Sequence, residues 1–456
     1  MQTFTRRLAI VLVSLFGFTV LAQDASPNFV VIVADDMAWN DAGAYGHPYI
    51  QTPNIDRLAK EGLRFESAFL TTSSCSPSRS SILTGRYPHA THAGELHQHL
   101  PADQVVLTEL LRDRGYHTAA AGKWHLGDAT RSKFDSILAG RPSGCELWVK
   151  ALEDRPRDKP FFLWLAAFDP HRPYKEDTIP RPHAPNDAVV PPFLPDSSET
   201  RTDLALYYDE ISRMDGYVGE VLAELERQGV AENTCVAFLS DNGRPFPRCK
   251  TTLYDSGIRT PFIVRYPGVT QPGSVSTRLI SSVDLAPTIV ELADASSTSR
   301  HQGKSFAALL SNPDSEFRTN VFAEHNWHDY SARERAVRSS RYLYIRNEYP
   351  DLPGTPPADA VRSMTYESMV SEHAEGRLAA EHSATFTVPR SREELYDTET
   401  DPHSLRNLAD DEKYADTLEE LREALDRWKV ETKDEAPAVR RPDEFDRTTG
   451  KRLDGV

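Results

Sequence analysis

A cysteine at position 75 opens the run Cys75-Ser76-Pro77-Ser78-Arg79, whose residue types could support nucleophilic chemistry beside an anion. Proline suits the first turn of a helix, so Pro77 predicts a helix whose amino end lies at Cys75. The free N–H groups and the dipole of such an end stabilise negative charge. From these residues alone, Cys75 is either a thiol of lowered pKa or a small buried side chain.

Two pairs of oxygen-bearing side chains, Asp35-Asp36 and Asp241-Asn242, stand far apart in the chain. Carboxylate and amide oxygens are ligands for hard cations such as Ca²⁺ or Mg²⁺, and neither pair offers the histidine or thiolate that favours zinc. Either pair alone could be a turn or a helix cap. Taken together with Cys75, they predict a cation site.

Lysines and histidines occur in places that could complete such a site. Lys123 and His125 are two residues apart after a strand-like run, so both side chains can point the same way. Asp169 and His171 follow another such run, and Lys250 comes shortly before a further one. A histidine there can donate or accept a proton. The alternatives are a structural histidine and, for Lys250, a solvated surface cation.

Short apolar runs must position these residues, and they alternate with helical patterns. This alternation predicts an α/β fold with a large mixed, mostly parallel sheet between helices. The runs are Asn28–Ala34, Tyr116–Ala121, Pro160–Phe168, Thr234–Leu239 and Ile258–Tyr266. In the first four, polar residues fall just beyond the carboxyl end, where open α/β sheets bind their ligands. One shared site is therefore expected.

The remaining patterns divide the chain further. Asp203–Gln228 has the spacing of a sheet-covering amphipathic helix, and the Pro-rich stretch Arg172–Pro195 is expected to be a surface loop near the site. Composition changes near residue 320. Beyond it lie two β-like runs, Ala336–Ile345 and Glu394–Tyr396, and a helical pattern over Asp411–Thr432. We expect a catalytic domain over 23–320 and a smaller α+β subdomain over 321–456.

The first residues resemble a signal peptide over 1–22, with Arg6 and Arg7 before an apolar stretch that ends at Val20-Leu21-Ala22. An uncleaved membrane anchor is the alternative, but the stretch is short for a membrane span. We expect an exported protein, periplasmic or secreted, without stable membrane insertion.

Charge and cysteine content exclude some functions. The net charge of −16 is opposite to the basic footprint of a nucleic-acid binder, so no nucleic-acid partner is expected. A site for an anionic substrate must then be locally basic. Four cysteines are too few for a disulfide scaffold. If Cys75 is used in chemistry, at most one bridge can form among Cys145, Cys235 and Cys249, and the sequence leaves its pairing open.

The run Cys75-x-Pro77-x-Arg79, followed by Leu83-Thr84-Gly85, resembles the signature of the formylglycine-dependent sulfatases of the alkaline phosphatase superfamily. The resemblance implies an alkaline-phosphatase-like fold. It also implies that a separate formylglycine-generating or anaerobic maturation enzyme oxidises Cys75 to formylglycine, an aldehyde whose hydrate is the nucleophile. The implied ligands of one Ca²⁺, preferred over Mg²⁺, are Asp35, Asp36, Asp241, Asn242 and residue 75.

The same resemblance implies roles for the cations and histidines. Lys123 and Lys250 would bind the sulfate, and Arg79 would hold the formylglycine hydroxyl. His171 would protonate the leaving group, and His125 would take a proton when sulfate is released. The implied reaction is a sulfohydrolysis of a sulfated mono- or oligosaccharide.

Further stretches resemble the heparan N-sulfatase (sulfamidase) branch, among them Leu96-His97-Gln98 and Glu394-Leu395-Tyr396-Asp397. Lys250 departs from the arginine expected there, and Glu324–His328 does not match closely. O-sulfate and N-sulfate substrates therefore both stay open. His97, Asp169 and His325 are predicted sugar contacts, with a structural role as the alternative for each. A phosphonate or phosphodiester hydrolase on the same scaffold and a non-catalytic saccharide-binding relative are the other functions considered.

Overall fold

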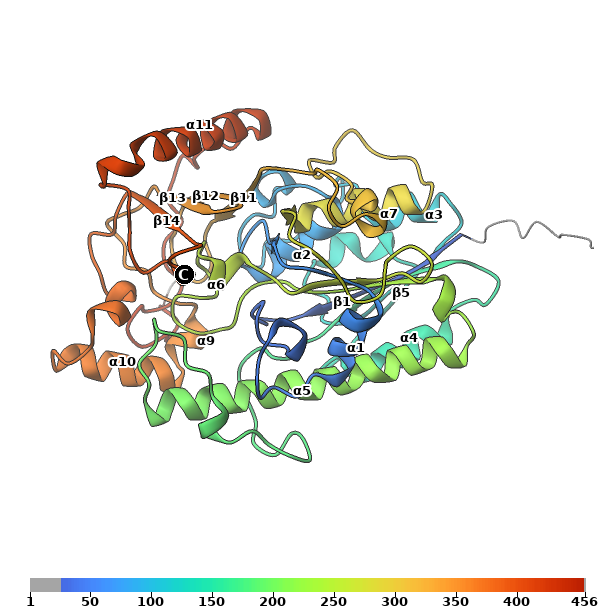
Figure 1. Ribbon diagram of the computed structural model, residues 1–456, viewed down its shortest axis with the longest axis horizontal. Coiled ribbons are helices and arrows are strands. Elements are labelled where there is room, and N and C mark those ends of the chain that lie inside the picture. Colours follow the sequence, from blue (N-terminus) through green and yellow to red (C-terminus); the bar gives the residue numbers. More distant parts are fainter. Residues whose placement is uncertain (1–25, 455–456) are drawn as a thin grey trace, which may run out of the picture.

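An eight-stranded sheet forms the centre of the structure, a computed structural model that describes residues 26–454 (Figure 1). The predicted signal peptide at 1–22 lies outside the described residues. The strand order is β5-β4-β6-β1-β7-β8-β2-β9. The first five strands in this order run parallel, and β8 is antiparallel to β7 and β2. The bounds are β1 Asn28–Ala34, β2 Leu63–Phe65, β4 His117–Gly122, β5 Ser136–Ala139, β6 Phe161–Ala166, β7 Thr234–Ser240, β8 Phe262–Arg265 and β9 Ser274–Ser276.

The central strand β1 shows why these sequences form a sheet covered on both faces. All seven of its residues are buried. Val30 and Ile32 belong to one hydrophobic core, and Phe29, Val31 and Val33 belong to another. Since side chains alternate between the two faces of a strand, an apolar residue at every position requires cover on both sides.

Helices supply that cover on each face (Figure 1). One core contains residues of α1 Pro53–Glu61, α4 Trp148–Asp154 and α5 Ser198–Arg227. The other contains residues of α2 Cys75–Thr84, α3 Leu107–Arg112, α7 Leu285–Leu292 and α8 Ala307–Ser311. The expected mixed, mostly parallel sheet between helices is thus confirmed.

Predicted element boundaries differ from the structure in informative places. The helix expected over Asp203–Gln228 begins earlier, at Ser198, because the Ser197 side chain accepts a hydrogen bond from the Thr200 N–H and caps it. The strand expected over Ile258–Tyr266 is shorter. A turn of helix, α6 Asp255–Ile258, precedes it, and Pro261 has no N–H to give to a ladder.

A second, four-stranded antiparallel sheet of order β11-β12-β13-β14 forms the C-terminal part, with α11 across it (Figure 1). The single run predicted over Ala336–Ile345 is in fact a hairpin that turns at Ser340 and Arg341. Buried Leu421, Leu425 and Trp428 of α11 pack against the sheet. The remaining bounds are β3 Ala68–Phe69, β10 Ile280–Ser281, β11 Asn320–His325, β12 Glu334–Ser339, β13 Tyr342–Asn347, β14 Glu393–Asp397, α9 Ala358–Val361, α10 Met364–Ala374 and α11 Ala415–Thr432.

Among residues 26–454, no helix is long and apolar enough to cross a bilayer. All four cysteines are buried and free, so no disulfide forms among them.

Candidate active site

Four neighbouring strands of the large sheet carry Asp35, Asp36, Lys123, His125, Asp169, His171, Asp241 and Asn242 just past their carboxyl ends. In the order β4, β6, β1 and β7, these strands lie side by side and parallel. Backbone hydrogen bonds continue past the strand ends, from Lys123 N to Ala166 O at 2.8 Å and from Asp241 N to Ala34 O at 3.1 Å. Residues distant in sequence are thereby held at one edge of the sheet.

Gly122 is required where β4 turns into the site. Its φ of +94° is in the left-handed region, and a Cβ atom there would lie 2.0 Å from the carbonyl oxygen of Ala166. Only glycine avoids both the strain and the clash. The residue that follows, Lys123, is consequently directed across the strand ends.

Cys75 is the first residue of α2 and lies among the acidic side chains. Its Sγ atom is 3.7 Å from Asp36 Oδ1. One ligand atom from each of Asp35, Asp36, Cys75 and Asp241 lies within 4.8 Å of the others, and all four residues are buried. Burial raises the pKa of the Cys75 thiol well above its usual value. The thiol is therefore protonated at neutral pH and is a poor nucleophile as it stands.

Three buried cations neutralise the three carboxylates. Lys123 Nζ donates to Asp35 Oδ2 at 2.5 Å, and Lys250 Nζ donates to Asp36 Oδ2 at 2.7 Å. Arg79 Nε donates to Asp241 Oδ2 at 2.8 Å. Burial alone would lower the pKa of Lys250, but the Asp36 carboxylate holds it well above its usual value. Both lysines are consequently charged at neutral pH. Lys250 is 1% exposed, which rules out the solvated surface cation considered above.

The donor set fits a hard divalent cation. Asp35 Oδ1 and Asn242 Oδ1 are buried acceptor atoms without a hydrogen-bond partner in the described part of the chain. An unsatisfied buried oxygen is costly unless a cation or a donor reaches it. Four oxygen-bearing residues, Asp35, Asp36, Asp241 and Asn242, therefore offer the hard ligands that Ca²⁺ or Mg²⁺ prefers.

Two histidines flank this cluster at different depths. His125, at φ +47°, has its ring centroid 5.0 Å from that of His97. Burial and the nearby Lys123 charge hold the pKa of His125 well below its usual value, so this ring is a neutral proton acceptor at neutral pH. His171 is partly exposed, and its Nε2 lies 3.9 Å from Asp36 Oδ2. Its Nδ1 is 2.5 Å from the backbone oxygen of Arg172.

Asp359 completes the site from the C-terminal part of the chain, and the sequence analysis missed it. Its Oδ2 atom is 3.6 Å from His171 Nε2 and 3.8 Å from Lys250 Nζ. Burial opposes its charge, but Lys250 and His171 hold its pKa below the usual value. Asp359 is on the four-residue helix α9, and no motif in its sequence could have revealed the contact.

A cleft of about 1140 Å³ opens beside the cluster and is lined by His97, Lys123, His125 and His171. Asp169, a predicted sugar contact, also lines the cleft. Its carboxylate, however, already accepts hydrogen bonds from other residues of the protein. Arg213 donates to both of its oxygens, at 2.8 and 2.9 Å, and Ser143 Oγ donates at 2.7 Å. The geometry favours the structural alternative for Asp169, while His97 remains available to a ligand.

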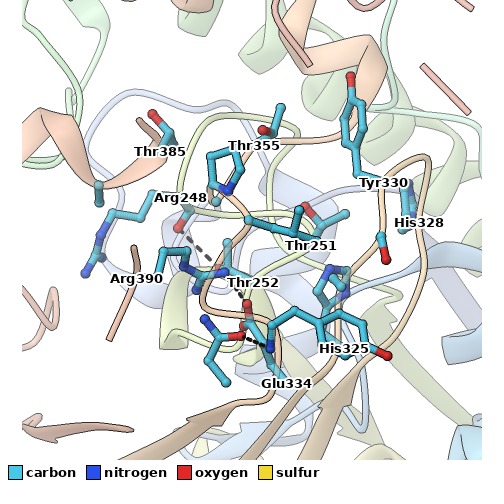
Figure 2. Close-up of a pocket in the computed structure, with 18 of the residues that line it drawn as sticks. Arg248, Thr251, Thr252, His325, His328, Tyr330, Glu334, Thr355, Thr385 and Arg390 are labelled. Carbon is cyan, nitrogen blue, oxygen red and sulfur yellow. Dashed lines mark hydrogen bonds and ion pairs between the residues drawn. The ribbon is translucent and has the colours of Figure 1, made fainter. Parts of the chain in front are cut away.

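His325, the third predicted sugar contact, is not brought to the cleft. It lines a separate small cavity of about 40 Å³, together with Arg248, Thr251 and the ion-paired Glu334 and Arg390 (Figure 2). Burial lowers the pKa of His325 to about 3, so the ring is neutral. A neutral, 5% exposed ring in this position favours the structural alternative.

Comparison with known proteins agrees with the geometry. The Sulfatase family model matches residues 27–144 and 145–295, and the model described as N-sulphoglucosamine sulphohydrolase, C-terminal, matches residues 248–351. Human N-sulphoglucosamine sulphohydrolase is 34% identical over 467 residues, which cover 91% of this chain and 92% of the relative. An ulvan-active sulfatase of Formosa agariphila is 31% identical over 92% of this chain and 77% of its own.

Solved structures show the same fold. A protein solved in complex with its substrate D-glucosamine-2-N,6-O-disulfate superposes with a TM-score of 0.71 over 90% of this chain and 99% of its own, at 21% identity. The family models together span both the large sheet and the start of the C-terminal sheet. The chain is therefore a hydrolase that belongs to the sulfatase family, with a C-terminal part of the N-sulphoglucosamine sulphohydrolase type.

Proposed function

We propose that this protein is an exported sulfohydrolase that removes sulfate from a sulfated saccharide, either an O-sulfate ester or an N-sulfoglucosamine. The observation that carries the proposal is the convergence of Cys75 with three buried carboxylates, Lys123 and Lys250 at one sheet edge. This is a site with cations for an anionic group and a residue that can become a nucleophile. The relatives named for N-sulphoglucosamine and ulvan support a saccharide substrate.

The proposal includes oxidation of Cys75 to formylglycine by a separate maturation enzyme. When formed, the aldehyde supplies a hydrate whose hydroxyl can attack sulfur. The raised pKa of the thiol supports this step, because the unmodified side chain offers little thiolate at neutral pH. Arg79, fully buried beside residue 75, would hold the hydroxyl and balance the negative charge around it.

The proposed cation is Ca²⁺, held by Asp35, Asp36, Asp241, Asn242 and residue 75. When bound, it supplies positive charge to a sulfate oxygen and favours ionisation of a bound hydroxyl. Lys123 and Lys250 would then donate hydrogen bonds to the sulfate as well as to the aspartates. Their positive charge would stabilise the negative charge of the transition state.

Proton movement falls to the histidines. His171, at the mouth of the cleft, would protonate the departing sugar oxygen or nitrogen. His125, neutral because burial and Lys123 lower its pKa, would accept the proton that allows sulfate to leave. The two rings lie on loops after different strands, β6 and β4, so the acid and the base are separate side chains that can act in successive steps.

The test is a comparison of matched substrates on protein whose residue 75 has been verified as formylglycine by mass spectrometry. We expect sulfate release from 4-nitrophenyl sulfate and from N-sulfoglucosamine or an O-sulfated sugar, with a much lower rate on an aryl phosphodiester. A preference for the phosphodiester would replace the proposal by the phosphonate or phosphodiester hydrolase alternative. Oxidised, Ca²⁺-loaded protein without any sulfate release would refute it.

A further inference from the structure

One exposed cation of the cleft, Arg141, has no acidic partner. Among residues 26–454 its guanidinium makes no ion pair or hydrogen bond, and its one contact of note is with the Phe168 ring, 4.3 Å from the ring centroid. Arginine on an aromatic face keeps its N–H edge free for a planar anion. Arg141 thus lies on the cleft wall as a charged group without a partner.

The other arginines of the cleft are already neutralised. Arg172 donates to both oxygens of Asp203 at 2.7 Å. Arg213 binds Asp169 and Glu210. The side chain of Lys175 is exposed and makes no ion pair in the described residues, and it lies on the Pro-rich loop rather than on the Arg141 loop. In a protein of net charge −16, an unpaired arginine beside an anion site is a positive charge left for the ligand.

Contacts of Ser143 and Gly144 hold the loop that carries Arg141 against the site. Ser143 O accepts a hydrogen bond from Phe168 N at 2.7 Å, and Ser143 Oγ donates to Asp169. Gly144, at φ +79°, packs so closely that a Cβ atom would lie 2.9 Å from the Cα of Gly122. Asp169, through Ser143, therefore helps to hold the Arg141 loop beside the residue that precedes Lys123.

Arg141 and Lys123 both lie near the Phe168 ring, which limits the distance between their charges. Lys123 Nζ lies 5.8 Å from the centroid of the same ring. With Arg141 4.3 Å from that centroid, the two charges are at most about 10 Å apart. Two charged substituents on one sugar ring, or charged groups on neighbouring rings, can span such a separation.

We propose that Arg141 binds a second anionic group of the saccharide, so that the enzyme selects substrates that carry another sulfate or a carboxylate near the sulfate it removes. The inference rests on the proposed function and narrows its substrate class. Arg141 acts as a specificity residue: its bidentate N–H edge matches a sulfate or a carboxylate, whichever the substrate presents.

The experiment measures kcat/KM on three saccharides: N-sulfoglucosamine, its 6-O-sulfated form, and N-sulfoglucosamine joined to a uronate. Wild-type enzyme should prefer one of the doubly charged substrates, and which one it prefers distinguishes the second sulfate from the carboxylate. Arg141→Gln should reduce that preference at least tenfold, mainly through KM. Arg141→Lys should recover only part of it, because lysine lacks the planar fork.

Arg131→Gln is the matched control. Arg131 is also exposed and lies 5.5 Å from an aromatic centroid, that of Trp124, but it pairs with Asp128 and does not line the cleft. It should leave the preference unchanged. A second measurement needs no turnover: calorimetric titration of D-glucosamine-2-N,6-O-disulfate into Cys75→Ala protein, with and without Arg141→Gln, should show at least tenfold weaker binding in the double variant.

The outcomes separate the two proposals. If wild-type protein hydrolyses 4-nitrophenyl sulfate but Arg141→Gln changes all three saccharide rates equally, or none of them, Arg141 has no specificity role and the sulfatase proposal stands. If fully oxidised wild-type protein releases sulfate from no substrate, the proposed function fails first.

Discussion

The carboxylate of Asp359 lies 3.6 Å from Nε2 of His171, although the two residues are far apart in the sequence. Asp359 Oδ1 accepts a hydrogen bond from Ala360 N at 2.9 Å, which fixes the side chain. Its Oδ2 has no hydrogen-bond donor in the described part of the chain and faces His171 and Lys250. A carboxylate in this position can orient the imidazole that the proposed function uses as its acid.

Asp359→Asn should therefore slow reactions that need an acid more than those that do not. A sugar hydroxyl is a poor leaving group and nitrophenolate is a good one. We expect kcat on a sulfated sugar to fall by about 100-fold, the lower end of what general acid catalysis contributes, and the loss on 4-nitrophenyl sulfate to be much smaller. Glu367→Gln, an exposed acid on α10, is the control. Equal losses on both substrates would instead indicate a structural role for Asp359.

Cys75→Ala should abolish turnover and leave the fold intact, because the side chain is small and an alanine fills most of its space. Sulfate release and the near-UV circular dichroism spectrum check the two halves of this expectation. Cys235→Ala is matched to it, since Cys235 is also buried but lies on β7 in the core beneath α7 and α8. That control should remain active. Appreciable activity of Cys75→Ala itself would contradict the nucleophile assignment.

Asp241→Ala should lose bound metal and activity together. The variant also leaves the fully buried Arg79 without its closest carboxylate, so we expect a loss of about 3–5 kcal/mol in the free energy of unfolding. In wild-type protein, Ca²⁺ at 100 times its Kd should add about 2.7 kcal/mol after chelation has removed the ion. Metal analysis and thermal unfolding give both numbers, and an active, metal-free variant would be incompatible with the proposed site.

His89 ties the turn after α2 to the C-terminal part of the chain and should make stability depend on pH. Its Nδ1 pairs with Glu324. Burial lowers the pKa of His89, but Glu324 outweighs that effect and the pKa is raised overall. Because the folded-state pKa lies above the unfolded one, the contribution is complete below about pH 6.5 and disappears as pH rises through the raised value.

His89→Gln should accordingly lower the free energy of unfolding by about 1–3 kcal/mol at pH 6, and by clearly less at pH 9. Urea unfolding at the two pH values measures the difference. His92→Asn provides a comparison, as His92 is exposed and asparagine tolerates its φ of +58°. A His89→Gln deficit that grows with pH would show that the sign of the pKa shift is wrong.

The central sheet and the acidic cluster beside Cys75 could be predicted because both follow from local patterns. Continuous apolar runs predict strands buried on both faces, and parallel strands bring their carboxyl ends to one edge. The sequence therefore predicts that Asp35, Lys123 and Asp241 lie close together, even when the strand order is not known. Cys75 was placed by its helix signal. None of these inferences required a long-range contact to be known in advance.

The remaining site residues depend on packing that no local pattern encodes. Asp359 comes within 3.6 Å of His171 because the C-terminal part of the chain folds back beside this histidine. The position of Arg141 depends on its contact with the Phe168 ring and on the hydrogen bond from Phe168 N to Ser143 O. Neither contact has a sequence signature. His325, a predicted sugar contact, likewise depends on packing, because β11 places it in a small cavity apart from the cleft.

Burial of Cys75 also constrains the order of events during biosynthesis. With 2% of its surface accessible and α2 packed on the sheet, the thiol is out of reach of any other protein once the chain has folded. An enzyme that oxidises it must meet the segment while it is still extended, before α2 docks. Under the proposed function, the yield of active protein would then depend on how quickly the chain folds relative to the oxidation of Cys75.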